Sequence, residues 1–197
     1  MTLFRSFTFQ LWEIFAGNLL LLLCSILYLA WWVVSFRPHS AGGSAGAAYL
    51  SSAFITGCLA IGLMSSGINA LSEGSKGVPV KYILMGGVAL FIVMLLATTA
   101  IFHRMVTSEL LIIHVWAVLE LSVTSVLYGT GRFGAGQAAA MTALVGMATM
   151  LALACYILYY RLDGTAQYRI GMVPLGADAV VMAVFLVLLA VSHSGGR

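Results

Sequence analysis

Residues Ser108 to Tyr128 read SELLIIHVWAVLELSVTSVLY. The stretch is long enough to cross a bilayer as a helix, because roughly 20 residues span a hydrocarbon core of ~30 Å. It nevertheless carries three ionisable side chains, Glu109, His114 and Glu120. A charge near the bilayer centre costs on the order of 2.5–3.5 kcal/mol, so such groups face a partner, a cavity or the interior of a bundle. The stretch therefore predicts the polar helix of a membrane bundle.

The polar side chains of this predicted helix divide between two faces. At about 100° per residue, Glu109, Trp116 and Glu120 lie on one side. His114 points roughly 120–140° away from that side. Glu109 comes in the first turn, where the helix dipole also favours an acid.

The carboxyl group of Glu120 is the deepest ionisable group in this stretch. At such a depth it must be protonated, paired or in contact with water. We expect Glu120 either to hold its proton more tightly than an exposed glutamate does or to line an aqueous cavity. The alternative is a protonated acid bonded to a neighbouring hydroxyl, for instance that of Ser52 or Thr56.

The composition of the whole chain is that of a membrane protein. Hydrophobic residues make up 62% of the 197 residues and charged residues only 8%, whereas a soluble domain is nearer about 25% charged. The mean hydropathy is +1.07, and the apolar runs are continuous, unlike the ~10-residue alternating segments of a membrane barrel. We predict an all-α, polytopic integral membrane protein in a plasma membrane of bacterial type.

The apolar runs predict six transmembrane helices in one transmembrane domain covering residues 1–197. The first run is longer than the signal-peptide core of about 7–15 residues, so we expect it to remain as an anchor. Tryptophans followed by Arg37 and Pro38 mark its end at the membrane–water interface. The predicted spans are about 11–36, 49–71, 82–102, 108–128, 138–160 and 172–192.

Two further carboxylates fall inside predicted spans. Glu13 lies near the start of the first span, and Asp178 lies about one turn beyond Pro174 in the sixth. Both positions suit an acid at a helix N-terminus, which the helix dipole stabilises. The alternative for each is a carboxylate that lines a cavity or an entry path. A separate face of the first span carries residues at a spacing of seven: Asn18, Ser25 and Trp32.

Internal similarity suggests a 3+3 inverted repeat. At an offset of 90 residues the second and third spans align with the fifth and sixth, and the loop E-G-S at 73–75 matches D-G-T at 163–165. Three spans per unit would invert one half across the membrane, as in many transporters with a site between the halves. The nine Lys and Arg residues divide five against four between the two sides, so they do not fix the orientation.

The chain shows no signature of a metal or cofactor site, and we expect none. Its four histidines are scattered, and neither H-E-x-x-H nor C-x-x-C occurs. The three cysteines all fall in apolar spans, which fits small apolar fillers. The net charge of +3 is spread over short loops, so a nucleic-acid partner is not indicated.

Three functional hypotheses follow from the polar helix. The first is a small channel or transporter for a small solute, in which Glu120 binds or relays a proton, Trp116 stacks on the solute and Glu109 guards the mouth. The third, which uses the same helix, is an intramembrane enzyme acting on a lipid, with Glu120 and His114 as acid and base. We favour a protein that is not an enzyme. The second hypothesis depends on other residues and is described below. The candidate path residues are Glu120, Trp116, Glu109, His114, Glu13 and Asp178.

The second hypothesis is a non-transporting membrane subunit that assembles with partners in the lipid bilayer or as a homo-oligomer. Small residues let helix backbones approach closely. The second span carries two rows of them: Ser52, Thr56 and Ala60, and Gly62, Ser66 and Ala70. A polar cavity open to water would favour transport, and a cavity open to lipid and lined by His114 would favour the enzyme.

Overall fold

The computed structural model describes residues 9–36, 44–73, 75–103 and 108–194. Within these ranges the chain forms six helices and no strand. All six helices are long and apolar enough to cross a membrane, so the predicted all-α membrane fold is confirmed for the described part of the chain. The helices are α1 (Phe9–Phe36), α2 (Ser44–Ser72), α3 (Val80–Phe102), α4 (Ser108–Gly129), α5 (Ala135–Tyr159) and α6 (Gly164–Ser194).

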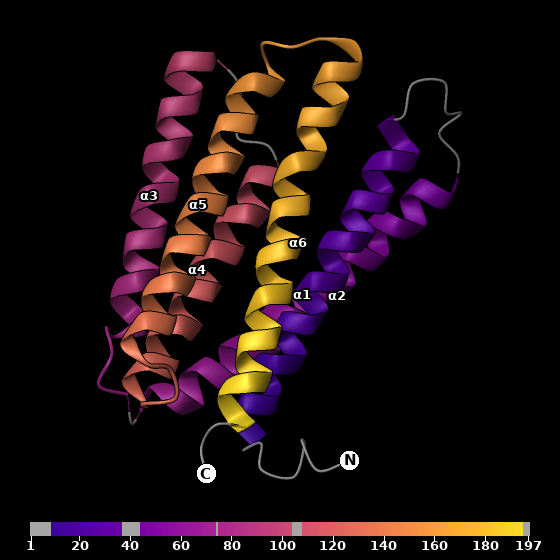
Figure 1. The fold of residues 1–197 in the computed structure, drawn as a ribbon. Coiled ribbons are helices and arrows are strands. Elements are labelled where there is room, and N and C mark those ends of the chain that lie inside the picture. Colours follow the sequence, from indigo (N-terminus) through magenta and orange to yellow (C-terminus); the bar gives the residue numbers. More distant parts are fainter. Residues whose placement is uncertain (1–8, 37–43, 74, 104–107, 195–197) are drawn as a thin grey trace.

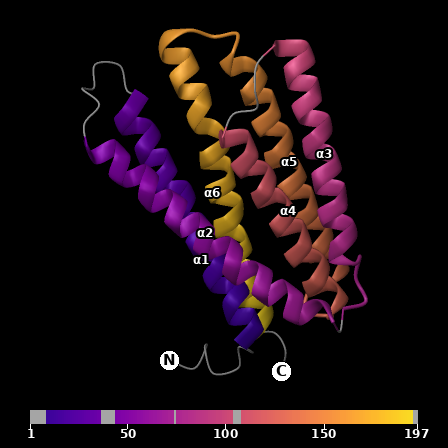
Figure 2. The ribbon, with the colours of Figure 1, turned by 180° about the vertical axis from the view of Figure 1, so that it is seen from behind.

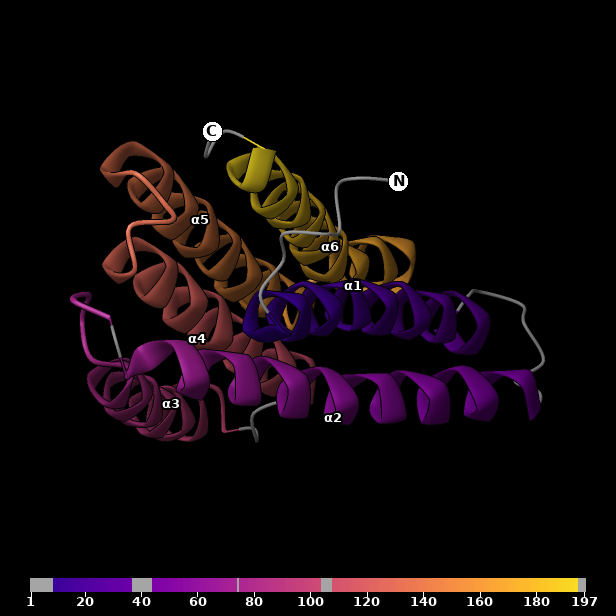
Figure 3. The same ribbon diagram turned by 90° about the horizontal axis from the view of Figure 1, so that it is seen from below.

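Consecutive helices run in opposite directions, and α1 begins at the end of the bundle where α6 ends (Figure 1). We call this the terminus end and the opposite end the pocket end. Helices α3 to α6 stand side by side, and the α1–α2 pair crosses them at an incline (Figure 2). Seen from below, α1 and α4 lie between α2 and α3 on one face and α5 and α6 on the other (Figure 3). Helix α4 is the most buried of the six spans, as its polar residues require.

Helices α1 and α2 make the most extensive helix–helix contact in the described part of the chain. Helix α1 has 28 residues and is therefore about 42 Å long, which exceeds a hydrocarbon core of ~30 Å and is accommodated by tilting. A Cβ on Gly17 would collide with the Met64 side chain and lie 3.2 Å from the Ala60 carbonyl oxygen. A Cβ on Gly67 would lie 2.9 Å from the Gln10 carbonyl oxygen. Glycine at both positions lets the two backbones touch.

The two predicted rows of small residues on α2 contribute unequally to this contact. Ala60 of the first row is fully buried. Gly62, Ser66 and Ala70 of the second row are exposed, and a Cβ on Gly62 would meet no atom within 4 Å. Helices α1 and α2 cross along Ala60 and Gly67, so the second row lies at the edge of this contact, where the Ser66 hydroxyl donates a hydrogen bond to Glu13 of α1.

Helix α6 begins at Gly164, eight residues before the predicted start at 172. Gly164 has a φ of +62°, which favours glycine at this turn. The predicted start at 172 would put Pro174 in the first turn of the helix, and this is wrong, because Pro174 lies inside the helix. A membrane helix tolerates such a proline because other groups can bond the carbonyl that it leaves without an intrahelical donor. The 3+3 repeat stays a prediction, and Gly74 of its first loop lies outside the described residues.

Helix α3 is joined to α4 at Gly87. A Cβ there would lie 2.6 Å from Cγ2 of Val118. His114 Nε2 donates a hydrogen bond to the Gly87 carbonyl oxygen at 2.9 Å, and the His114 ring lies 5.6 Å from that of Phe91. His114 therefore holds α3 against α4.

We expect Gly87→Ala to lower the free energy of unfolding by about 1–3 kcal/mol, the usual cost of overpacking. The added methyl group meets Val118 and pushes α3 away from the His114 bond. Thermal unfolding of the purified protein in detergent measures this loss. Gly86→Ala is the matched control, because a Cβ at Gly86 meets nothing within 4 Å. Equal melting temperatures for the two variants would contradict the packing described for α3.

Candidate functional site

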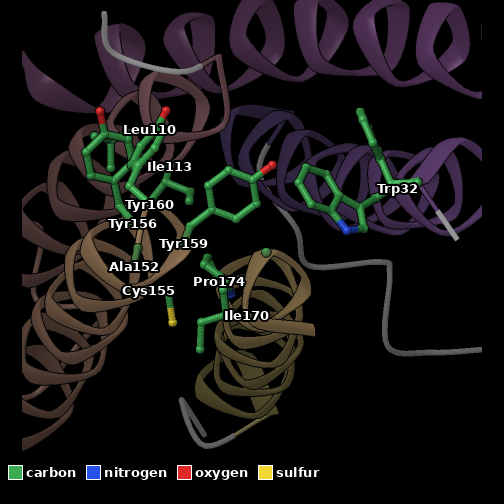
Figure 4. Close-up of a pocket in the computed structure, with 12 residues that line it drawn as sticks. Trp32, Leu110, Ile113, Ala152, Cys155, Tyr156, Tyr159, Tyr160, Ile170 and Pro174 are labelled. Carbon is green, nitrogen blue, oxygen red and sulfur yellow. The ribbon is translucent and has the colours of Figure 1, made fainter. Parts of the chain in front are cut away.

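A pocket of about 340 Å³ lies at the pocket end of the bundle, between α1, α4, α5 and α6. Its walls are mainly aromatic and aliphatic, and Figure 4 shows how they converge from the four helices. The lining residues are Trp32, Phe36, Leu110, Ile113, Ala152, Cys155, Tyr156, Tyr159, Tyr160, Ile170, Gly171 and Pro174.

Trp32 forms the α1 wall of this pocket. Its Nε1 donates a hydrogen bond to the Tyr168 carbonyl oxygen at 3.3 Å, and its ring contacts Gly171 of α6. The centroids of the Trp32 and Tyr159 rings are 5.9 Å apart. The sequence indicated an interface marker here, yet Trp32 is only 5% exposed and joins α1 to α5 and α6.

Three tyrosines at the end of α5 line the pocket beside Ala152 and Cys155. The rings of Tyr156 and Tyr160 are 5.0 Å apart, and those of Tyr159 and Tyr160 are 5.4 Å apart, all in edge-to-face arrangements. In Figure 4 the Tyr159 ring stands between Trp32 and the other two tyrosines, with its hydroxyl toward Trp32. These rings therefore form one aromatic wall across α1 and α5.

Polar groups continue inward from the pocket along α4 and α6. On α4, Ile113 lines the pocket and Glu120 follows two turns deeper; Glu120 is 0% exposed. On α6, Pro174 lines the pocket and Asp178 follows one turn deeper; Asp178 is 2% exposed. Both carboxylates therefore lie beyond the inner wall of the pocket.

Five buried side chains carry polar atoms without a hydrogen-bond partner among the described residues. They are the two carboxylate oxygens of Glu120, one of Asp178, the Trp116 indole nitrogen, the Thr124 hydroxyl and both amide atoms of Asn18. An unsatisfied buried polar group costs about 1–3 kcal/mol. We call these side chains the core polar groups: Asn18, Trp116, Glu120, Thr124 and Asp178.

Asn18 of α1 lies beside the Glu120 carboxyl group, although the two side chains do not have the geometry of a hydrogen bond. The alternative prediction, that the hydroxyl of Ser52 or Thr56 bonds the Glu120 carboxyl group, is wrong. Ser52 is exposed, and the Thr56 hydroxyl donates to the Ser52 carbonyl oxygen of its own helix at 2.9 Å. Asn18 of α1 therefore lies beside Glu120, where the sequence suggested a hydroxyl of α2.

The Thr124 hydroxyl differs from other hydroxyls in these helices. Those of Thr56, Ser122 and Thr149 each donate to the carbonyl oxygen one turn back in their own helix, at 2.7–2.9 Å. The Thr124 hydroxyl is buried and makes no such bond within the part of the chain that the structure describes. Its oxygen is therefore available to another group in the core.

The structure places the other predicted site residues apart from the core polar groups. His114 faces α3 and not Glu120, as the spacing along the helix predicted. Glu13 is partly exposed near the terminus end, where its Oε1 accepts a bond from the Ser66 hydroxyl at 3.2 Å. Glu109 lies in the first turn of α4, but its side chain lies outside the described residues.

The helix-terminus interpretation of Asp178 is wrong. Asp178 lies fourteen residues after Gly164, the first residue of α6, so the free amides of the first turn are far from its carboxylate. The error follows from the misplaced helix start. Asp178 thus lies near the middle of its helix, like Glu120 on α4.

Sequence reasoning missed Asn18 and Thr124 as members of the site, and Trp32 and Tyr159 as parts of the pocket wall. One signal was present, because Asn18, Ser25 and Trp32 recur at a spacing of seven on α1 and all three are buried. Residues at that spacing share a helix face. Tertiary packing decides which face of α5 meets α1, and no pattern in the sequence indicates that face.

The chain matches no family model, and no curated protein or solved structure matches it either. The geometry of the pocket and the core polar groups is therefore the ground on which a function can be argued.

Proposed function

We propose that this integral membrane protein is a channel or transporter for a small solute, and that the membrane is a plasma membrane of bacterial type. The path enters through the pocket and continues along the core polar groups. One observation carries the proposal: polar atoms from α1, α4 and α6 without partners lie inward of an open pocket. Buried polar groups are normally bonded, so groups without a partner inside a membrane bundle indicate a passage for a solute or an ion.

Asp178 and Glu120 have distinct places along this path. Asp178 lies one turn inward of Pro174, so the solute meets it first. Glu120 lies deeper, beside Asn18, with Trp116 one turn away on the same face of α4. Trp116 offers a flat surface on which a solute can stack. At the two mouths, Glu109 lies toward the pocket end and Glu13 toward the terminus end.

The proposal includes proton coupling at the core carboxylates. Asn18 of α1 lies beside the Glu120 carboxyl group. Trp116 and Thr124, one turn before and one turn after Glu120, share its face of α4. None of these three side chains is a base. Among the described residues the buried base is His114, which is bonded to Gly87 of α3. A carboxylate that is buried in a medium of low dielectric without a cationic partner becomes neutral by taking up a proton. Glu120 thus binds and releases a proton as the solute passes.

The separation of Glu120 and His114 disfavours the enzyme hypothesis. An acid and a base that act on one lipid must both reach it, whereas these two side chains face different neighbours, α1 and α3. An assembly role alone would leave the core polar groups bonded to one another, and they are not.

Flux through proteoliposomes tests the proposal. In a stopped-flow osmotic assay the vesicles first shrink as water leaves, and their reswelling then reports the entry of the small solute. A pH-sensitive dye inside the vesicles reports protons that move with it. We expect Glu120→Gln to reduce flux at least about tenfold, since the lost charge-assisted contacts are worth about 1.5–3 kcal/mol. Glu73→Gln is the matched control, because Glu73 is exposed in the α2–α3 loop. Equal flux through wild type and Glu120→Gln would remove Glu120 from the path, and flux no greater than in empty vesicles would reject transport.

A further inference from the structure

We infer that the pocket selects an organic ammonium ion, a substituted amine carrying a positive charge. The inference rests on the proposed function and names the substrate class of the same site. Its starting point is the chemistry of the pocket wall, in which five of the twelve lining residues are aromatic: Trp32, Phe36, Tyr156, Tyr159 and Tyr160.

The remaining wall offers nothing that would hold an anion. Its other seven side chains are aliphatic or small, with the Cys155 thiol as the most polar. None of the described lining residues carries a positive charge. Aromatic faces carry negative electrostatic potential and attract a cation, with about 0.5–2 kcal/mol or more per ring, and aromatic cages are the usual site for quaternary ammonium ions.

A backbone oxygen adds to this preference. Pro174 has no amide hydrogen, so the carbonyl of Ile170, four residues earlier in α6, loses its intrahelical donor. Both residues line the pocket. A carbonyl without that donor is a further electronegative group on the α6 wall, suited to an ammonium N–H or to the polarised carbons around a quaternary nitrogen.

The groups inward of the pocket also favour positive charge. Asp178 and Glu120 are buried and have oxygens without partners, whereas the buried base, His114, faces α3 in the described structure. Two arginines, Arg161 and Arg169, lie near this end of the bundle, but both are exposed, and exposed charges are screened within about 10 Å at 0.1 M salt. A cation thus passes from aromatic faces to carboxylates.

Calorimetry on the purified full chain in detergent tests the inference with a pair of probes that differ in charge alone. Choline carries a quaternary nitrogen, and 3,3-dimethyl-1-butanol has the same shape with a carbon in its place. We expect choline to bind at least about tenfold more tightly than the alcohol, because the charge adds cation–π attraction from several rings. Comparable binding of both probes would overturn the inference and leave an apolar pocket.

Substitutions at Tyr159 locate the binding. Tyr159→Phe keeps the ring and should bind choline within about twofold of wild type, whereas Tyr159→Leu should weaken it about fivefold to thirtyfold. Tyr128→Leu makes the same change at an exposed tyrosine at the terminus end and should leave binding unchanged. Thermal unfolding checks that each variant is folded. Loss in Tyr159→Phe equal to that in Tyr159→Leu would assign the effect to the hydroxyl and overturn the cation–π site.

The outcomes separate this inference from the proposed function. Choline binding without flux of any solute would keep the ammonium site and reject transport. Flux of neutral solutes that depends on Glu120, with no choline binding, would keep transport and overturn the ammonium site. If choline does not bind and no solute crosses the membrane, both the ammonium site and the proposed transport are rejected.

Discussion

Glu120→Met should give a protein that is more stable than the wild type and inactive in transport. Both carboxylate oxygens of Glu120 are buried without a hydrogen-bond partner in the described structure. Removing such a group recovers about 1–3 kcal/mol of desolvation cost, and methionine fills a similar volume with an unbranched, adaptable side chain. For a chain of this size each kcal/mol raises the melting temperature by about 2–4 °C. Thermal unfolding in detergent measures the gain, and proteoliposome flux measures the loss.

Leu119→Met is the control for this prediction. Leu119 precedes Glu120 on α4 and is buried in the apolar core. A swap of leucine for methionine costs less than about 1.5 kcal/mol and removes no polar group, so flux should persist. A lower melting temperature for Glu120→Met than for Leu119→Met would show that the Glu120 carboxyl group is bonded and holds the bundle together. The site would then be structural.

Gly17→Leu should prevent the α1–α2 pair from forming. Even a Cβ at this position collides with the Met64 side chain and lies 3.2 Å from both the Ala60 carbonyl oxygen and the Met64 amide nitrogen. Side chains can rotate away, but backbone atoms move only if the helices separate. We expect a loss of about 3 kcal/mol or more, the upper end of the cost of overpacking. The measurement is the melting temperature together with the folded fraction after size-exclusion chromatography.

Gly62→Leu provides the comparison on α2. A Cβ at Gly62 meets nothing within 4 Å, so the added side chain projects from the bundle and should leave stability within about 0.5 kcal/mol of wild type. A similar loss in both variants would mean that a leucine disturbs either helix regardless of its neighbours. It would also argue against the close contact at Gly17. Destabilisation by Gly62→Leu alone would indicate that the exposed face of α2 is covered by another helix.

The contact at Gly17 also affects the functional site. Close backbone contact at Gly17 fixes where α1 crosses α2, and Asn18 is the next residue. The same crossing brings the Asn18 side chain to Glu120. A milder change, Gly17→Ala, should therefore shift Asn18 and reduce flux in protein that still folds.

Much of the fold could be predicted because hydrophobic length is a local property. An apolar run of about 20 residues must form a helix in a bilayer, since lipid offers no partner for exposed backbone groups. The predicted opposite faces of His114 and Glu120 also needed nothing more than the angle between successive residues of a helix. The start of α6 was harder to predict. Residues 164–171 are polar enough to suggest a loop, yet they extend the helix beyond the apolar run and place Asp178 near its middle.

The sequence by itself determined that the described part of the chain is a six-helix membrane bundle with Glu120 deep in its fourth helix, because composition and helical periodicity follow from the chain alone. The tertiary structure decided which groups meet. It brought Asn18 of α1 to Glu120, set Trp32 against the tyrosines of α5, and turned His114 toward Gly87. These contacts depend on the tilt and rotation of whole helices, which close packing at glycines such as Gly17 and Gly87 fixes between segments distant in sequence.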